Sequence, residues 1–157
     1  MRKLTAILAV VLVLLAGFAA WFYLGGTLHA QVFIQTANAA DYPEAYGSIR
    51  SLLESGSAPQ TFEGAALGEE AARYTLVDVN LRLTNRGLFP AEWLDISAEP
   101  VQGDIAVYAL TGEGSDVPAR DSATVNLKLI TTAPADAMRD IRIQYYVYGM
   151  KRTITVR

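Results

Sequence analysis

The chain has 157 residues, of which 52% are apolar and 18% charged, with a formal net charge of −3 and no cysteine. This length suits one domain, and the apolar fraction argues against a disordered chain. The lack of cysteine excludes disulfides, thiolate nucleophiles, Cys-ligated metal sites and a lipid-modified N-terminal cysteine. A small cysteine-free domain outside the cytoplasm must be held together by its core, which is commoner in bacterial surface proteins and favours a bacterial origin.

Two of the positive charges, Arg2 and Lys3, stand at the start of the chain. Without them the chain has 11 Lys and Arg against 16 Asp and Glu, a net charge of −5. A mildly acidic domain has no electrostatic reason to bind nucleic-acid phosphates or anionic lipid surfaces. Nucleic-acid binding is therefore not expected.

Residues 4–24 form an uncharged apolar segment behind these two cations. As a helix this segment would be about 31 Å long, enough to cross the hydrocarbon core of a bilayer. The positive-inside rule places the N-terminus in the cytoplasm and the rest of the chain outside. The residues that we expect to span the membrane include Leu4, Leu12, Leu15, Trp21, Tyr23 and Leu24.

The leader has two interpretations. It is either an uncleaved signal anchor, or a signal peptide with an apolar core at 4–16 and a cut near Ala19 or Ala20. The aromatic run at 21–23 and the lack of a well-placed A-x-A triplet favour the anchor. We therefore expect residues 1–26 to be a signal anchor with an exit linker, and residues 27–157 to be an extracytoplasmic domain.

The first half of this domain combines a strand with a helix. Residues 27–35 alternate between apolar and polar positions, which predicts a strand. Residues 41–56 carry apolar residues at helical spacing, with Asp41 as a capping residue, Pro43 in the first turn and Gly56 at the end. This pattern predicts a short amphipathic helix at about 42–55. Residues 64–72 are small and acidic, as in a loop.

From Tyr74 onward the period of the pattern is two. Val77, Val79, Leu81 and Leu83 alternate with polar residues, and the remaining expected strands lie at about 93–98, 105–109, 123–130, 141–148 and 152–157. Gly149 and Met150 fit a type II′ turn between the last two. About seven strands separated by turn signals predict an all-β antiparallel sandwich, preceded by one transmembrane helix and one inserted short helix.

Two stretches of this region resemble known families. Residues 74–87, YTLVDVNLRLTNRG, are similar to the opening strand and Asn-x-Gly turn of immunoglobulin-like families, which include bacterial extracellular immunoglobulin-like domains and late-embryogenesis-abundant type 2 (water-stress) domains. Residues 117–125, VPARDSATV, resemble the loop that leads into a late strand of those families. The resemblance covers about residues 74–157. It implies an immunoglobulin-like fold and no catalytic residues.

Aromatic residues are the main candidates for a contact surface. Tyr146 and Tyr148 are expected to point outward on the same face, where exposed rings suit an interaction surface as well as ordinary cross-strand packing. Trp93 is expected in the core. The loop 88–90 is expected to tuck under the sandwich.

Catalytic and metal sites have little support. His29 is the single histidine, and no G-x-S-x-G, P-loop, G-x-G-x-x-G or H-E-x-x-H motif is present. Asp95 and Glu99 form a conceivable carboxylate pair. The acids at 113, 116 and 121 form a conceivable calcium loop, but loop acids of this kind are usually solvated. We expect no catalytic residue, no metal and no cofactor.

These observations favour a non-enzymatic, membrane-tethered extracytoplasmic binding or structural module, such as an accessory part of a cell-envelope assembly. Its expected partners are the lipid bilayer, through the N-terminal helix, and a protein. The alternative is a secreted soluble β-sandwich that binds a ligand or glycan after the leader is cleaved.

Overall fold

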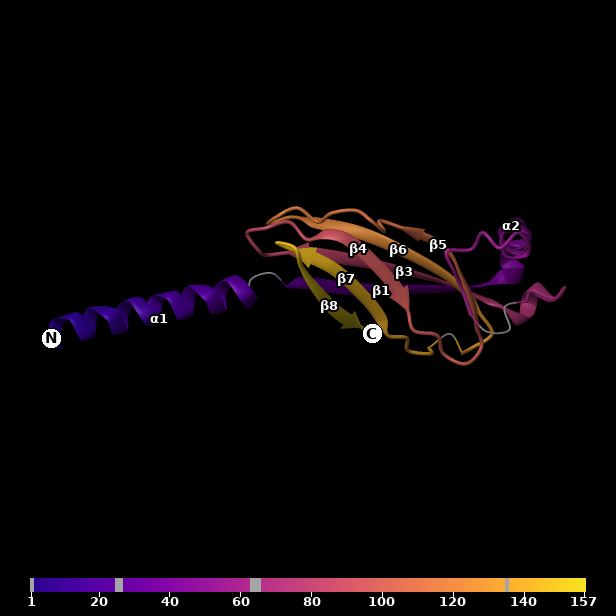
Figure 1. Ribbon diagram of the computed structural model, residues 1–157. Helices are drawn as coiled ribbons and strands as arrows, with labels where there is room; N and C mark the ends of the chain where they lie inside the picture. The colour runs from indigo at the N-terminus through magenta and orange to yellow at the C-terminus, as the bar shows by residue number, and fades with distance from the viewer. Residues whose placement is uncertain (1, 25–26, 63–65, 135) are drawn as a thin grey trace.

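The computed structural model describes residues 2–24, 27–62, 66–134 and 136–157, without the side chains at 2–5, 23 and 24. Its strands form two antiparallel sheets, with the orders β1-β3-β6-β5-β2 and β4-β7-β8 (Figure 1). The strands are β1 (Leu28–Asn38), β2 (Gln60–Thr61), β3 (Thr75–Asn85), β4 (Glu92–Ala98), β5 (Asp104–Thr111), β6 (Ser122–Thr131), β7 (Ile141–Val147) and β8 (Met150–Val156). The all-β antiparallel prediction is confirmed, with β2 as an additional short strand. The immunoglobulin-like assignment stays a prediction.

Helix α1 (Arg2–Leu24) projects from one end of the sandwich (Figure 1). Its side chains are exposed along most of its length; those of Leu12 and Leu15 are each 59% exposed. Within the part of the chain that the structure describes, no helix has the combined length and apolar character of a membrane span. The predicted crossing by residues 4–24 therefore stays a prediction, and the side chains of Leu4, Tyr23 and Leu24 lie outside the description.

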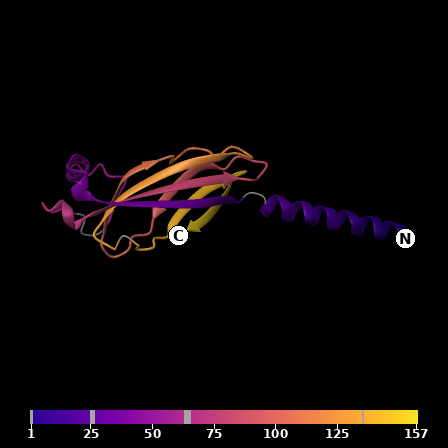
Figure 2. The same ribbon diagram turned by 180° about the vertical axis from the view of Figure 1, so that it is seen from behind.

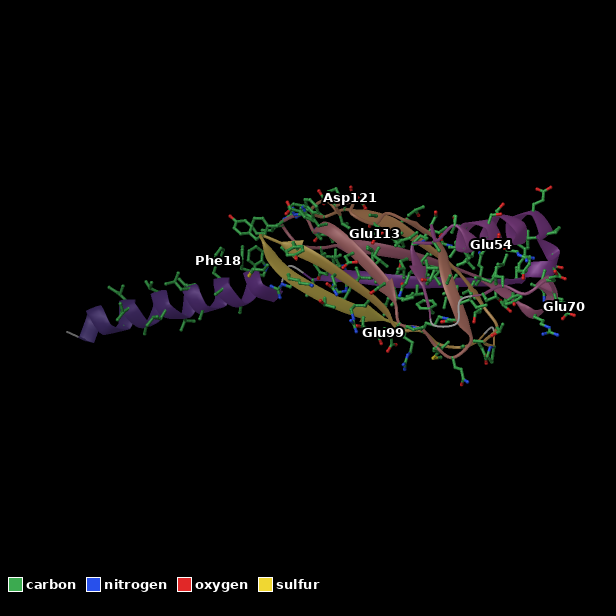
Figure 3. The ribbon with its side chains drawn as sticks, turned by 45° about the vertical axis from the view of Figure 1, so that its right-hand side comes forward. Phe18, Glu54, Glu70, Glu99, Glu113 and Asp121 are labelled. Atoms are coloured by element: carbon green, nitrogen blue, oxygen red, sulfur yellow. The ribbon has the colours of Figure 1, made fainter. Side chains whose placement is uncertain are left out.

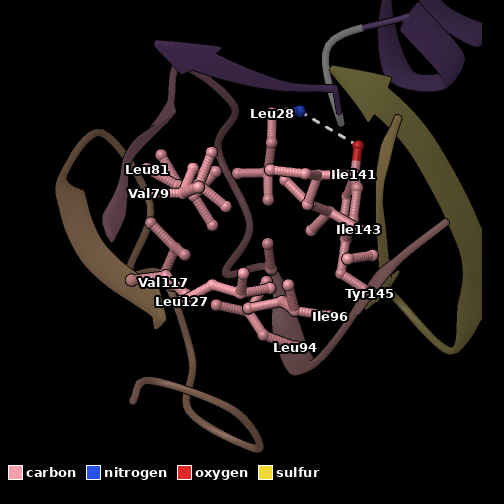
Figure 4. Close-up of a cluster of buried hydrophobic side chains, with 14 of the residues drawn as sticks. Leu28, Val79, Leu81, Leu94, Ile96, Val117, Leu127, Ile141, Ile143 and Tyr145 are labelled. Atoms are coloured by element: carbon pink, nitrogen blue, oxygen red, sulfur yellow. Dashed lines mark hydrogen bonds between the residues drawn. The ribbon is translucent and has the colours of Figure 1, made fainter. Parts of the chain in front are cut away.

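The core lies between the two sheets, where the strands alternate as the sequence predicts. On β3, residues Val77, Val79, Leu81 and Leu83 are all buried, and they face β7 residues such as Ile143 across the sandwich (Figure 4). Full burial of an aliphatic side chain of this size contributes about 1.5–3 kcal/mol. A few such residues on each strand fix which face points inward, because a slip of one residue would expose them all.

Helix α2 (Pro43–Glu54) caps the end of the sandwich opposite α1 (Figure 1). Tyr46 and Ile49 are buried against Tyr74 and the outer face of the five-stranded sheet, which confirms the predicted amphipathic helix. Asp41 is not its cap. It lies in the short 3-10 helix η1 (Ala39–Asp41), so Tyr42 occupies the capping position without a side-chain hydrogen bond.

Trp93 is a correction to the sequence analysis, because it is 70% exposed and not part of the core. The register between β4 and β7 shifts between Glu92 and Asp95, and Trp93 adopts a left-handed backbone with φ of 56°. Such a bulge adds one residue to one strand and turns a side chain outward. Leu94 fills the core position instead.

The turn between β7 and β8 is also a correction. Val147 pairs with Met150, so the central residues are Tyr148 and Gly149, with φ of 56° and 72°. Two positive φ angles define a type I′ turn, whose twist matches the strands, in place of the predicted type II′ turn at Gly149 and Met150. Tyr148 therefore stands at the tip of the hairpin.

Candidate functional site

Strand β1 forms one border of the five-stranded sheet and pairs only with β3 there. Figure 2 shows it running along the length of the sandwich at this border. Its sequence, LHAQVFIQTAN, contains no charged residue, no proline and no glycine. At its centre, Phe33 and Ile34 are 57% and 53% exposed. The strand thus offers a long, uncharged edge with apolar side chains on both faces.

Hydrogen bonds at the two ends of β1 show which backbone groups face away from β3. The N–H of Leu28 donates to the Tyr145 hydroxyl at 3.0 Å (Figure 4), whereas the N–H just after the strand, at Ala39, donates to the Tyr74 carbonyl at 2.9 Å. Backbone groups of an antiparallel strand point to alternate sides. The N–H and C=O groups of residues 30, 32, 34 and 36 therefore lie on the open side of β1.

The other sheet borders carry the features that discourage strand pairing. β2 is only two residues long. β4 has a bulge and carries Glu92 and Asp95, and β8 carries Lys151 and Arg152. Among the described strands, β1 alone combines a long border with the absence of charge and bulge. This contrast makes the β1 edge the strongest candidate for a contact with another chain.

A second candidate surface, the α1-proximal tip, lies where α1 meets the sandwich. Rings of Phe22, Phe89 and Tyr148 contact one another with centroid distances of 4.8–5.6 Å. A pocket of about 280 Å³ beside them is lined by Arg86 and Arg120 as well as by Trp21, Phe22 and Leu88.

The loop that carries this tip is held by a buried amide. The Asn85 side chain donates to the carbonyls of Phe89 at 2.8 Å and Val117 at 3.1 Å, and it accepts from the N–H of Gly87 at 2.9 Å. Phe89 is half-buried as predicted for the loop, but Leu88 is exposed, contrary to the expectation that it tucks under the sandwich.

A third surface is a polar network on the outer face of the five-stranded sheet. Asn126 donates to Asp78 and to Asn80, each at 2.8 Å, and the Lys128 ammonium lies 3.3 Å from Asp78. A groove of about 390 Å³ beside the network is lined by residues that include Gln35, Thr36, Tyr42 and Tyr108. The polar groups of β3 and β6 are satisfied by one another, so the network first of all stabilises the pairing of these strands.

No protein-family model and no curated protein matches the chain.

The predicted contact residues Tyr146 and Tyr148 are both exposed, at 39% and 67%. Tyr148 joins the ring cluster with Phe22 and Phe89, whereas Tyr146 lies two residues earlier on β7, opposite Lys151. The tyrosines are thus near neighbours with different surroundings. The ring cluster was not foreseen, because it brings together residues far apart in the sequence.

The weaker sequence candidates do not converge on one centre. His29 is an exposed residue of β1, and Glu99, one of the two conceivable paired carboxylates, forms an ion pair with Arg142. In the conceivable calcium loop, Asp116 accepts the N–H of Trp93 at 3.0 Å and Asp121 that of Ser122 at 2.7 Å. The described residues contain no group of three His, Cys, Asp or Glu placed to hold a metal ion.

Two buried polar groups were missed by the sequence analysis. Burial by itself would raise the pKa of Asp104, but hydrogen bonds from Arg139, Thr131 and Val101 outweigh burial and hold this pKa below its ordinary value. Burial raises the pKa of Tyr145, which keeps its hydroxyl protonated beside the Leu28 N–H. Both groups have structural roles. The Asp104–Arg139 ion pair stabilises the end of the sandwich where β5 begins, and the Tyr145 hydroxyl holds the start of β1 by its hydrogen bond with Leu28.

Proposed function

We propose that the chain is a non-enzymatic binding module, tethered to a membrane by residues 4–24, that accepts an extended segment of a partner protein at the free edge of β1. The sandwich would then work outside the cytoplasm, as an accessory part of an envelope assembly. The observation that carries this proposal is the long uncharged edge of β1, on which Phe33 and Ile34 are exposed.

The tether is supported by the uncharged sequence of residues 4–24 behind Arg2 and Lys3, and by the exposure of apolar side chains around α1. A helix that is apolar all round needs an apolar environment. The sandwich leaves Leu12 and Leu15 uncovered, and acyl chains would cover them.

Strand addition is supported by the geometry of β1. Residues 30, 32, 34 and 36 present their N–H and C=O groups on the open side, and an incoming strand would form main-chain hydrogen bonds with them. The incoming strand would also cover the exposed side chain of Ile34. An edge strand without charge, proline or bulge readily pairs with a strand of another chain, and natural proteins usually carry features that prevent this. An edge without such features therefore suits a protein whose function is to pair with another chain.

The partner strand would come from a different protein and not from a second copy of the chain. Two identical edges that pair about a two-fold axis run antiparallel. Because α1 precedes β1 and projects from one end of the sandwich (Figure 2), this pairing would place the two α1 helices at opposite ends of the dimer. The helices could not then enter the same bilayer. The occupant we propose is an extended, uncharged segment of another envelope protein.

Membrane tethering can be tested with single cysteines, since the chain has none of its own. In intact cells, Ser57→Cys should react with a membrane-impermeant maleimide, whereas Lys3→Cys should react only after permeabilisation. Both variants should stay in the membrane fraction after alkaline washing. Recovery of a soluble protein whose sequence starts near Trp21 would reject the tether.

Strand addition can be tested with Ile34→Lys, which places a charge on the proposed contact. In gently solubilised membranes the unaltered chain should migrate as a complex, and Ile34→Lys should migrate as the single chain. Met138→Lys is the matched control, because it alters an exposed apolar side chain outside β1. Equal migration of the two variants, or migration of the unaltered chain by itself, would contradict the proposal.

The groove beside Asp78 supports a second candidate function, glycan binding by a secreted form. It combines the amide of Gln35 with the rings of Tyr42 and Tyr108 at one open surface. Polar groups beside aromatic rings can hold a ligand that has polar edges and apolar faces. Binding of soluble oligosaccharides that is lost in Tyr42→Ala, together with a cleaved N-terminus, would favour this candidate over the tethered module.

A further inference from the structure

The α1-proximal tip gathers aromatic, aliphatic and arginine side chains at one place. It combines the ring cluster of Phe22, Phe89 and Tyr148 with the exposed side chain of Leu88 and the two arginines that line its pocket. Aromatic rings and arginine are the side chains that proteins place at the boundary between lipid and water.

The short connection between α1 and the sandwich brings this tip to the membrane surface when residues 4–24 span the bilayer. The inference therefore rests on the membrane tether of the proposed function. Phe22, in the last turn of α1, contacts Phe89 at 5.3 Å and Tyr148 at 5.6 Å between ring centroids. Only three residues, 25–27, separate α1 from β1 in the sequence. The tip is therefore within reach of the headgroup layer.

The arginines of the two ends of the domain differ in their partners, although acidic residues occur at both ends. Arg86 and Arg120 are exposed and form no ion pair with any described residue; the carboxylate of the neighbouring Asp121 accepts the N–H of Ser122. At the opposite end, Glu54 and Glu70 project from the region around α2 (Figure 3). The arginines of that end, Arg50 and Arg73, are paired with these two acids.

We infer that the α1-proximal tip docks on the extracytoplasmic surface of the bilayer that holds α1. In the docked state, Arg86 and Arg120 bind phosphate groups of phospholipids. The side chains of Leu88 and Tyr148 enter the headgroup layer. Arginine suits this role because its guanidinium group stays charged and forms paired hydrogen bonds with phosphate oxygens. Docking would hold the sandwich upright, with the α2 end directed away from the bilayer.

The sequence analysis expected no affinity for anionic lipid, since the net charge after the leader is −5. The structure changes this expectation for one end only. An electrostatic attraction falls off within about 10 Å at moderate salt, so local charge and not net charge decides whether the tip binds a surface. Each basic residue close to an anionic bilayer favours the docked state by about fivefold.

The full chain, reconstituted in phosphatidylcholine vesicles with or without phosphatidylglycerol, provides the test. Single cysteines at Leu12, Leu88 and Ser57 are labelled with a fluorophore and exposed to quenchers attached to lipid acyl chains or headgroups. We expect acyl-chain quenching of the label at position 12, headgroup quenching at position 88, and no quenching at position 57 by either.

The role of the arginines is tested on the Leu88→Cys chain. The double substitution Arg86→Gln and Arg120→Gln should lower the docked-to-undocked ratio about 25-fold in vesicles with phosphatidylglycerol, from about fivefold for each charge. Arg73→Gln is the matched control at the opposite end and should leave the quenching unchanged. Thermal unfolding of each variant checks that the fold is retained.

The outcomes separate the inference from the function on which it rests. Quenching at position 12 without quenching at position 88 would overturn tip docking and leave the tether standing. Quenching at position 88 that persists in the double arginine variant would overturn phosphate binding. No acyl-chain quenching at position 12 would overturn the tether and the docking together.

Discussion

Removal of the Arg139 side chain by Arg139→Met should be among the most destabilising single substitutions in the sandwich. Asp104 and Arg139 have side-chain exposures of only 0% and 6%. The guanidinium group donates to both carboxylate oxygens, with Nη2–Oδ1 at 2.6 Å and Nε–Oδ2 at 2.8 Å. Without Arg139, the carboxylate remains buried with no cation beside it, which costs about 3–5 kcal/mol. This is a large share of the ~5–15 kcal/mol that stabilises an ordinary domain.

The assay is urea unfolding of the full chain in detergent micelles, with Arg142→Met as the matched control. Arg142 pairs with Glu99 at the surface, where both side chains are about half exposed, so its loss should cost no more than about 1 kcal/mol. The double variant Asp104→Leu with Arg139→Met should recover most of the lost stability, because no charge is left buried. Equal losses for Arg139→Met and Arg142→Met would refute this reasoning.

Three further predictions concern local structure. Tyr145→Phe removes the acceptor of the buried Leu28 N–H, so it should lower the free energy of unfolding by about 1–3 kcal/mol. Hydrogen exchange at the Leu28 amide should become faster, and an unchanged exchange rate would contradict this prediction. The Cβ added by Gly149→Ala meets no neighbouring atom, but it is placed on a backbone with φ of 72°. The substitution should therefore lower the free energy of unfolding in urea by about 1–2 kcal/mol. An unchanged unfolding midpoint would argue against the type I′ turn. The pKa of Asp104 is lowered by folding, so its contribution to stability is full above its ordinary value of 3.8 and is lost as the pH falls towards the lowered value. Acid titration of unfolding should show this loss, and Asp104→Asn should remove the corresponding pH dependence.

The sequence predicted most of the strands because their burial alternates with a period of two. β3, β6 and β7 have long alternating runs, so all three were predicted as strands, and the inward residues named for β3 are buried. β2 was missed because two residues carry no periodicity. Trp93 was misplaced because a bulge reverses the alternation, and neither a bulge nor a left-handed backbone at tryptophan leaves a signal in the residues around it.

The candidate site was less accessible to sequence reasoning, because it depends on which strands are neighbours. The uncharged composition of residues 28–38 is visible in the sequence, but the same composition is ordinary for a strand in the middle of a sheet and would then indicate no contact surface. β1 becomes a candidate contact surface only because the sheet order places it at a border. Likewise, Phe22, Phe89 and Tyr148 meet only because the hairpin tip and the β3–β4 loop converge beside α1.

The central claim is that β1 accepts a strand from another protein, and its most direct test is site-specific photocrosslinking in intact membranes. A photoreactive amino acid is introduced in turn at residues 32, 34 and 36, with position 138 as the control, and the attachment sites in the partner are mapped by mass spectrometry. Strand addition predicts one partner segment, in which each step of two residues along β1 moves the attachment by two residues. Attachments scattered over unrelated chains, or as abundant from position 138 as from β1, would contradict the claim.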